Sequence, residues 1–483
     1  MNRLDRWPSI ASLCLVLCGC QAVPVSEMGS GMGTDAAKPL ECMQRFQCRE
    51  FVIGAWAWPD ARPSPDFFDE EYCRRYKEAG FNVILYAFPN WLGTKCPPIS
   101  FDEPMRLAEK VGLGVVIHTV TLDAEPWGDV EIPAEKYREI TDGHYARLPE
   151  LQWLHARYGN SPALAGYLLN DNCGLHDYTV ECANWLLTNA PGVFPWMSTN
   201  PDPEGQAKVP MPMLSTQVYP FSYHHGAPEK HNRLSFCNVL ERDRHQANRS
   251  NMALWPIVAT FSSTESPSQL RFQAFTSIAY GAQAVWYFSY TRYFRAVLYD
   301  AAQECHAYIG SAVGPRVLGH RSIGVFHAGS EIPKGALIPG PGKLLESMNS
   351  NLLVGVLVTE QQFKAGNPEP DYLIVVDTRT SRVAEPERTW WREWNKTSPR
   401  LPEDVVAARP MVESVLKQEL PAQQWEIRFG PAVKKVEAFL PGGEEQGVQP
   451  WEPTGDSSAE TEAGRRGLAE SELAEWRTLK VCS

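Results

Sequence analysis

The chain has 483 residues, of which 43% are hydrophobic and 21% are charged. It is too long for one ordinary domain and too hydrophobic for a disordered protein. Its formal net charge of −12 and the lack of a Lys/Arg stripe argue against a nucleic-acid partner, because phosphate binding needs a basic surface.

The N-terminus is typical of an exported bacterial protein. Arg3 and Arg6 precede an apolar run over residues 10–18, which is too short to span a bilayer as a mature helix but fits a signal peptide. The run ends in Leu-Cys-Gly-Cys at Cys20, which resembles the lipobox of bacterial lipoproteins. We expect residues 1–20 to be a lipoprotein signal peptide. The protein would then be lipid-anchored in the cell envelope, on its periplasmic side or outer surface, and would touch the membrane only through Cys20. An ordinary signal peptide cut nearby is the alternative.

Export changes the expectation for the cysteines. Nine cysteines follow Cys20, and none forms a CxxC pair or a Cys/His cluster with the spacing of a zinc site. Disulfides are therefore expected, and neither a metal nor a cofactor is. Cys42 and Cys48 are the best local pair, and Cys73 with Cys96 is a second. The odd number leaves at least one thiol free.

After an expected tether over residues 21–48, short apolar runs alternate with helical segments. Eight runs are found, at residues 51–59, 81–89, 112–120, 163–171, 192–200, 214–221, 253–261 and 282–290. The helical segments are residues 67–80, 101–111, 175–190, 228–249, 266–281 and 296–313. Eight such units predict a (β/α)8 TIM barrel over residues 49–316. A doubly wound open sheet is the rival, but no glycine-rich fingerprint follows the first run.

The pattern changes near residue 316. Short segments rich in Val, Ile and Leu follow, with connections that contain Gly, Pro and Asn. They lie at residues 322–327, 352–359, 371–377, 424–429 and 433–440. These segments predict an antiparallel β-sandwich over residues 317–441. Residues 442–483 are expected to be a flexible acidic tail with one helical stretch at 468–480.

In a barrel of this kind the reacting groups sit at the carboxyl ends of the strands. Here these ends carry many aromatic rings and a few polar groups. Sugars need this combination, because their C–H faces stack on aromatic rings while their hydroxyl groups need hydrogen-bond partners. The expected carbohydrate-binding residues are Trp56, Trp58, Trp91, His118, Asn170, Asn172, Trp196, Tyr219, Trp286 and Tyr287. Alternatively, some of these aromatic side chains fill the barrel or cover its ends.

Several motifs resemble barrel proteins of the glycoside hydrolase clan that includes β-galactosidase-type enzymes. They are Pro-Ala-Leu-Ala-Gly-Tyr at 162–167 leading to Asp171, Thr-Gln-Val-Tyr-Pro-Phe at 216–221, Leu-Arg-Phe-Gln-Ala-Phe at 270–275 before Ala-Tyr-Gly-Ala-Gln at 279–283, and Trp-Tyr-Phe-Ser-Tyr at 286–290. The similarity covers about residues 50–320. It implies a catalytic glutamate after strand four and a second at the end of strand seven. This chain has Asp171-Asn172-Cys173 at the first place, and the run 253–261 ends without a carboxylate.

Glycoside hydrolysis ordinarily needs two carboxyl groups. We expect Asp171 to be one of them and Glu265 to be its partner, with Asp123 or Glu125 as alternatives. The alternative for Asp171 is a structural residue that forms hydrogen bonds with loop amides. The alternative for Glu265 is an ordinary loop residue before a helix cap.

The sequence thus predicts a glycoside hydrolase that acts on oligo- or polysaccharide at the cell envelope. The missing glutamates keep open a second hypothesis, a catalytically inactive lipoprotein that captures glycan. An esterase on the same fold has little support, because the chain lacks a G-x-S-x-G motif.

Overall fold

The computed structural model describes the barrel strands, most of their helices and a set of C-terminal strands. The described residues are 38–57, 70–86, 101–119, 148–171, 177–198, 202–217, 219–221, 232–260, 266–288, 296–367, 369–381, 427–431, 433, 435–439 and 478–482. Within them, no helix is both long and apolar enough to cross a membrane.

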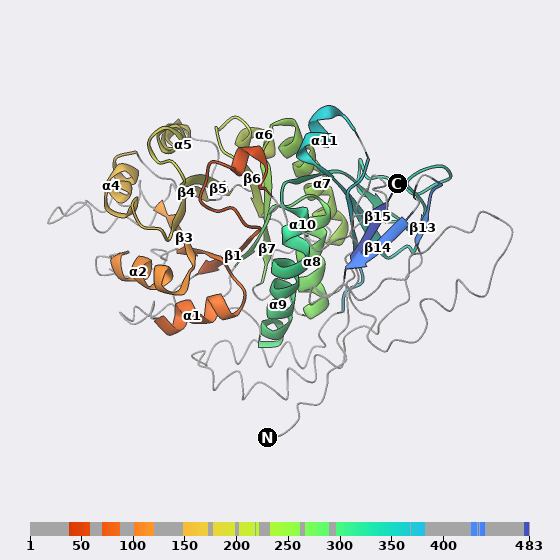
Figure 1. Ribbon diagram of the computed structural model, residues 1–483, viewed down its shortest axis with the longest axis horizontal. Helices are drawn as coiled ribbons and strands as arrows, with labels where there is room; N and C mark the ends of the chain where they lie inside the picture. Colours follow the sequence, from red (N-terminus) through yellow and green to blue (C-terminus); the bar gives the residue numbers. More distant parts are fainter. Residues whose placement is uncertain are drawn as a thin grey trace, which may run out of the picture.

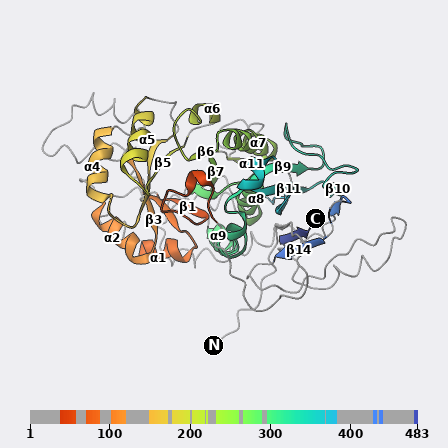
Figure 2. The same cartoon turned by 45° about the horizontal axis from the view of Figure 1, so that its top comes forward.

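Eight parallel strands form the predicted barrel, with helices on its outside (Figures 1 and 2). The strands are β1 (Val52–Ala57), β2 (Val83–Tyr86), β3 (Gly114–His118), β4 (Leu164–Asp171), β5 (Phe194–Ser198), β6 (Met213–Gln217), β7 (Ala253–Ala259) and β8 (Ala284–Phe288). Hydrogen bonds link them in the order β5-β4-β3-β2-β1-β8-β7-β6, and β5 lies next to β6. The sheet is therefore a nearly closed barrel, in which β5 and β6 meet without a strand pairing among the described residues, and each apolar run holds one strand.

A side chain takes the place of a neighbouring strand where β5 meets β6. Gln206 lies at the end of the short helix α6 (Pro203–Gln206). Its Oε1 accepts a hydrogen bond from the backbone N–H of Ser215 at 2.9 Å, and its Nε2 donates to the carbonyl of Ser215 at 2.5 Å. These two bonds satisfy the backbone N–H and carbonyl of Ser215 at the seam, where an unpaired buried amide would be costly.

The remaining helices pack around the barrel. They are α1 (Glu70–Glu78), α2 (Asp102–Val111), α4 (Leu148–Tyr158), α5 (Asp177–Asn189), α7 (Arg233–Arg249), α8 (Pro267–Ala279), α9 (Ala296–Tyr308), the π-helix Ile309–Val313 and α10 (Gly314–Val317). Helix α8 begins where the sequence predicts, because Ser266 caps it by accepting from the N–H of Gln269, and Pro267 occupies its first turn. All thirteen residues of α8 are buried.

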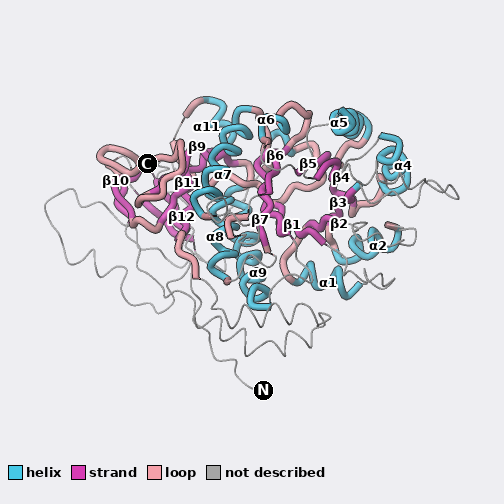
Figure 3. Tube along the Cα trace, turned by 180° about the vertical axis from the view of Figure 1, so that it is seen from behind, coloured by secondary structure: helices cyan, strands magenta, loops and turns pink. Residues whose placement is uncertain are grey.

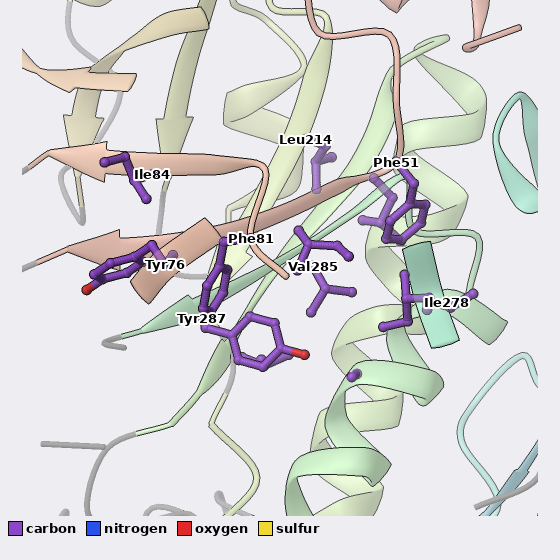
Figure 4. Packing of buried hydrophobic residues seen from close by; sticks show 14 of the residues in the cluster. Phe51, Tyr76, Phe81, Ile84, Leu214, Ile278, Val285 and Tyr287 are labelled. Atoms are coloured by element: carbon purple, nitrogen blue, oxygen red, sulfur yellow. The ribbon is translucent and has the colours of Figure 1, made fainter. Parts of the chain in front are cut away.

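Side chains alternate between the inside and the outside of the barrel along each strand. Four tryptophans, Trp56, Trp196, Trp255 and Trp286, meet in the apolar cluster on the inside, and none is more than 1% exposed. The rings of Trp196 and Trp286 stack with centroids 4.3 Å apart. A larger cluster fills the space between strands and helices (Figure 4). The barrel interior is thus a packed core and not a pore.

Residues 38–48, predicted to belong to the tether, instead cover the N-terminal end of the barrel. Leu40, Met43 and Phe46 are buried in the interior cluster, and Phe46 forms a bridge with Gly192, just before β5. Apolar side chains at spacings of three place one face of this segment on the barrel, so it belongs to the folded body.

The expected disulfide between Cys42 and Cys48 is absent, because both are free thiols in the structure. Cys42 lies against the backbone of Ala253, whereas Cys48 lies against that of Glu50, so the two side chains have different surroundings. Cys73 is buried, and its expected partner Cys96 lies outside the described residues, so this second disulfide stays a prediction.

The C-terminal part contains the predicted antiparallel strands beside the barrel (Figure 3). Strands β9 (His320–His327), β11 (Leu352–Thr359) and β12 (Tyr372–Asp377) form one sheet, β10 (Leu345–Met348) pairs with β13 (Ile427–Phe429), and β14 (Lys435–Phe439) pairs with β15 (Thr478–Cys482). A short helix, α11 (Glu360–Ala365), follows β11. A separate apolar cluster joins the first sheet to the β10–β13 pair.

One element in this part differs from the prediction. The sequence predicts a helical stretch at residues 468–480, but residues 478–482 form β15, which is antiparallel to β14. Leu479 and Val481 alternate with Lys480, which is the period of a strand, and residues 468–477 lie outside the described residues.

The barrel and the C-terminal sheet meet at α8, where β11 approaches the helix closely. A Cβ on Gly355 of β11 would lie 2.1 Å from the carbonyl oxygen of Ala279. Gly355→Ala should therefore lower the free energy of unfolding by about 1 to 3 kcal/mol, because the two backbones must separate. Urea denaturation measures the change. Gly310→Ala is the control, since a Cβ there meets nothing within 4 Å. Equal stability of both variants would contradict the close approach.

Candidate active site

A β-bulge decides which residue of β4 faces the inside of the barrel at its carboxyl end. Leu168 pairs with Trp196, and both face inward, but the register then shifts so that Asn170 pairs with Met197 and Asp171 with Ser198. One extra residue reverses the alternation, because side chains switch faces at every step along a strand. Asp171 thereby faces the same side as Ser198.

Three strand ends bring their polar side chains together around Asp171. Nε2 of Gln217, at the end of β6, donates to Oδ1 of Asp171 at 2.7 Å and to Oγ of Ser198 at 3.0 Å. The hydroxyl of Tyr219 donates to Oε1 of Gln217 at 2.8 Å. Asp171, Gln217, Ser198 and Tyr219 therefore form one hydrogen-bonded cluster, which spans β4, β5 and β6.

The two carboxyl oxygens of Asp171 differ in their surroundings. Oδ1 accepts from Gln217, whereas Oδ2 has no hydrogen-bond partner among the described residues. The residue is only 6% exposed. Burial raises the pKa of Asp171 from 3.8 to about 7, and the bond from Gln217 opposes this rise. A carboxyl group with such a pKa both gives and takes a proton near neutral pH.

Aromatic rings lie beside this cluster. The half-buried rings of Tyr219 and Phe288 stack with centroids 5.9 Å apart and planes 20° from parallel. Phe288 also packs edge-on against Trp56, with ring centroids 5.3 Å apart, and Trp56 packs edge-on against His118, with ring centroids 6.1 Å apart. Burial and the nearby carboxylate of Asp171 raise the pKa of Tyr219 well above its usual value, so its hydroxyl keeps its proton.

The predicted site residues that the structure describes fall into three groups. Asp171 and Tyr219 belong to the cluster, whereas Trp56 and His118 are linked to it through ring contacts: Trp56 packs on Phe288, and His118 packs on Trp56. Trp196 and Trp286 face inward but lie one inward position below the strand ends, where they are fully buried in the core. They therefore fill the barrel, which is the alternative that the sequence leaves open for these aromatic residues.

Tyr287 and Asn170 face the wrong way for the predicted site. Tyr287 packs outside the barrel against Phe81 and the buried His306, because it alternates with the inward-facing Trp286 and Phe288 (Figure 4). Nδ2 of Asn170 donates to Oγ1 of Thr179 in α5 at 3.2 Å, so the bulge turns this residue outward. Neither side chain belongs to the cluster.

Other predicted site residues lie outside the described part of the chain. They are Trp58, Trp91, Asn172, Asp123, Glu125, Glu265 and the lipidation residue Cys20. Across the residues that the structure does describe, no group of three His, Cys, Asp or Glu side chains could hold a metal ion.

Three members of the site were not among the predicted residues. Ser198 and Phe288 each lie two positions after a predicted tryptophan, and Gln217 lies two positions before Tyr219. Counting inward positions in steps of two from the buried tryptophans, Trp196 and Trp286, finds Ser198 and Phe288. Gln217 stands inside a motif that the resemblance includes.

No protein-family model and no curated protein matches the chain. Solved structures with a similar fold include the β-galactosidase from a Rahnella species, with 13% identity, 60% of each chain covered and a TM-score of 0.43. The endo-β-1,4-mannanase from Thermotoga petrophila has 10% identity, with 66% of this chain and 85% of that chain covered and a TM-score of 0.39. The endoglucanase from Pseudomonas stutzeri has 12% identity, coverage of 55% and 96%, and a TM-score of 0.37. Such a likeness concerns the fold alone.

Proposed function

We propose that the protein is a glycoside hydrolase that acts on oligo- or polysaccharide, with Asp171 as its general acid/base. The observation that carries the proposal is the placement of Asp171 at the inward-facing end of β4, with Oδ1 held by Gln217 and Oδ2 without a partner among the described residues. The raised pKa of this carboxyl group supports the role. The stacked rings of Tyr219 and Phe288 supply an aromatic surface beside it.

In this proposal Asp171 gives its proton to the glycosidic oxygen while the bond from that oxygen to the anomeric carbon breaks. A second carboxyl group attacks the anomeric carbon or takes a proton from water that attacks it. Glu265, Asp123 and Glu125 are the candidates for this group. In the attacking case, the ionised Asp171 then takes a proton from the water that releases the sugar.

A second function, capture of glycan without cleavage, is favoured by one observation. In the glycoside hydrolase clan that the sequence resembles, strand seven supplies the second carboxylate. Here β7 ends in Ala259 and is followed by Thr260, so neither position carries a carboxylate. The same aromatic rings and amide groups bind sugar in either case, and only turnover separates the two functions.

The deciding experiment is a screen of the purified full-length protein against a panel of polysaccharides, measuring both binding and the release of reducing ends. Release from at least one polysaccharide that is bound supports the hydrolase. Binding without release by the wild type at any pH from 4 to 9 rejects the hydrolase and supports capture.

We also propose that the protein is anchored in the bacterial cell envelope by a lipid on Cys20. Cys20→Ser should move the protein from the membrane fraction to the soluble export compartment, because the thiol that carries the lipid is gone. Fractionation with acyl labelling measures this, and Cys18→Ser is the matched control. Unchanged fractionation together with no label in the wild type would reject the anchor.

A further inference from the structure

We propose that Tyr219 is a positioning residue that acts through the amide of Gln217 and decides which oxygen of Asp171 carries the catalytic proton. The inference rests on the proposed function, because it gives Asp171 the role of acid/base. It concerns a feature that burial alone cannot fix, which is the direction in which the carboxyl group presents its proton.

The side-chain amide of Gln217 has two orientations of nearly equal shape, related by exchange of Nε2 and Oε1. In the observed orientation Nε2 points at Asp171 and Ser198, and Oε1 points at the hydroxyl of Tyr219. The reversed amide would turn Oε1 towards Asp171, where it would accept a hydrogen bond from the protonated carboxyl group. A hydroxyl that donates to Oε1 at 2.8 Å favours the observed orientation.

The observed orientation determines where the proton of Asp171 sits. Oδ1 already accepts a hydrogen bond from Nε2 of Gln217 at 2.7 Å. The protonated carboxyl group therefore carries its proton on Oδ2. Oδ2 has no partner among the described residues and is not one of their fully enclosed polar atoms. The proton therefore sits on the oxygen that a substrate can reach. With the reversed amide, the proton would lie on Oδ1 and point at Gln217.

Among the groups around Asp171, the hydrogen-bonded pair of Tyr219 and Gln217 has the main influence on where its carboxyl group is protonated. The neighbouring strand β3 contributes His118 at its end, and β6 leads into Tyr219. β5 contributes Ser198 and β8 contributes Phe288, and neither of these titrates near neutral pH. Among the described residues no second acid contributes to the shift in the pKa of Asp171.

The test measures the pKa of Asp171 directly, by ¹³C NMR of the protein labelled at Asp carboxyl carbons, with Asp171→Asn to assign the signal. Tyr219→Phe should raise the pKa of Asp171 by about one pH unit, because the freed amide reverses and favours the protonated acid. Gln217→Leu should also raise it, because the donor is lost. Tyr167→Phe is the matched control, since Tyr167 lies on β4 but faces outward, and should leave this pKa unchanged.

An unchanged pKa in folded Tyr219→Phe would overturn the inference. If that variant does not fold, Tyr219→Met, which also removes the hydroxyl group, decides in the same way. In an active enzyme, Tyr219→Phe should also lower kcat and move the basic limb of the pH–rate profile upward, with KM nearly constant. The NMR result needs no substrate. A shifted pKa in a protein that cleaves no glycan would therefore reject the hydrolase and leave the positioning role intact.

Discussion

At pH 8 the Asp171→Asn variant should be more stable than the wild type by up to about 4 kcal/mol. This value corresponds to the difference between the usual pKa of 3.8 and the raised value of about 7. Above pH 7 the folded wild type must hold a charged carboxylate that is 6% exposed. Asparagine keeps the shape and an acceptor for Nε2 of Gln217 without the charge.

The sign of the effect follows from proton binding. Between pH 4 and pH 7 the folded wild type keeps a proton on Asp171 that the unfolded chain has lost, so the wild type loses stability as the pH rises through this window. Below pH 4 both states are protonated, and the two proteins should be equally stable. Denaturant unfolding at pH values from 4 to 8 measures the difference.

Asp177→Asn is the control, because Asp177 is an exposed residue in the first turn of α5. Its stability should stay close to that of the wild type, because an exposed side chain contributes little to folding. Suppose that the free energy of unfolding of Asp171→Asn differs from that of the wild type by the same amount at every pH. Ionisation of Asp171 then costs the folded protein no stability, and its proposed role as an acid at neutral pH is rejected.

The fold was largely predictable from the sequence because each barrel strand is buried on both faces. Such strands read as continuous apolar runs, and helices separate them, so counting the runs finds the barrel. Helix α4 (Leu148–Tyr158) was not predicted, although Leu148, Leu151, Leu154 and Tyr158 recur at helical spacing. Strands β10 and β15 were also missed, since each is a short edge segment whose pairing depends on distant residues.

The same burial hides the site. A run that is apolar throughout does not reveal which of two neighbours faces inward, so the sequence cannot separate Trp286 from Tyr287. The bulge in β4 depends on the register with β5 and leaves no mark in the composition of the strand. Asp171 was predicted from its place at a strand end, but the amide of Gln217 that holds it becomes visible only when β4 and β6 are placed in space.

Asp171→Asn should also lower kcat by about 100-fold or more on any glycan that the wild type cleaves, which is the usual scale for the loss of a general acid/base. Glycan binding should stay nearly unchanged, because asparagine has the same size and still accepts from Gln217. Since the variant is expected to be at least as stable as the wild type, a loss of rate cannot come from unfolding. Initial rates of reducing-end release and binding isotherms measure the two effects.

The comparison of substrates sharpens this result. An aryl glycoside with a good leaving group needs little protonation, so Asp171→Asn should slow its cleavage less than that of the natural linkage if Asp171 is the acid. Asp177→Asn should leave both rates unchanged. Equal losses on both substrates would assign Asp171 to the other carboxylate role, attack or activation of water. Full activity of Asp171→Asn would remove it from the chemistry, and the acid would then be sought with Glu265→Gln, Asp123→Asn and Glu125→Gln.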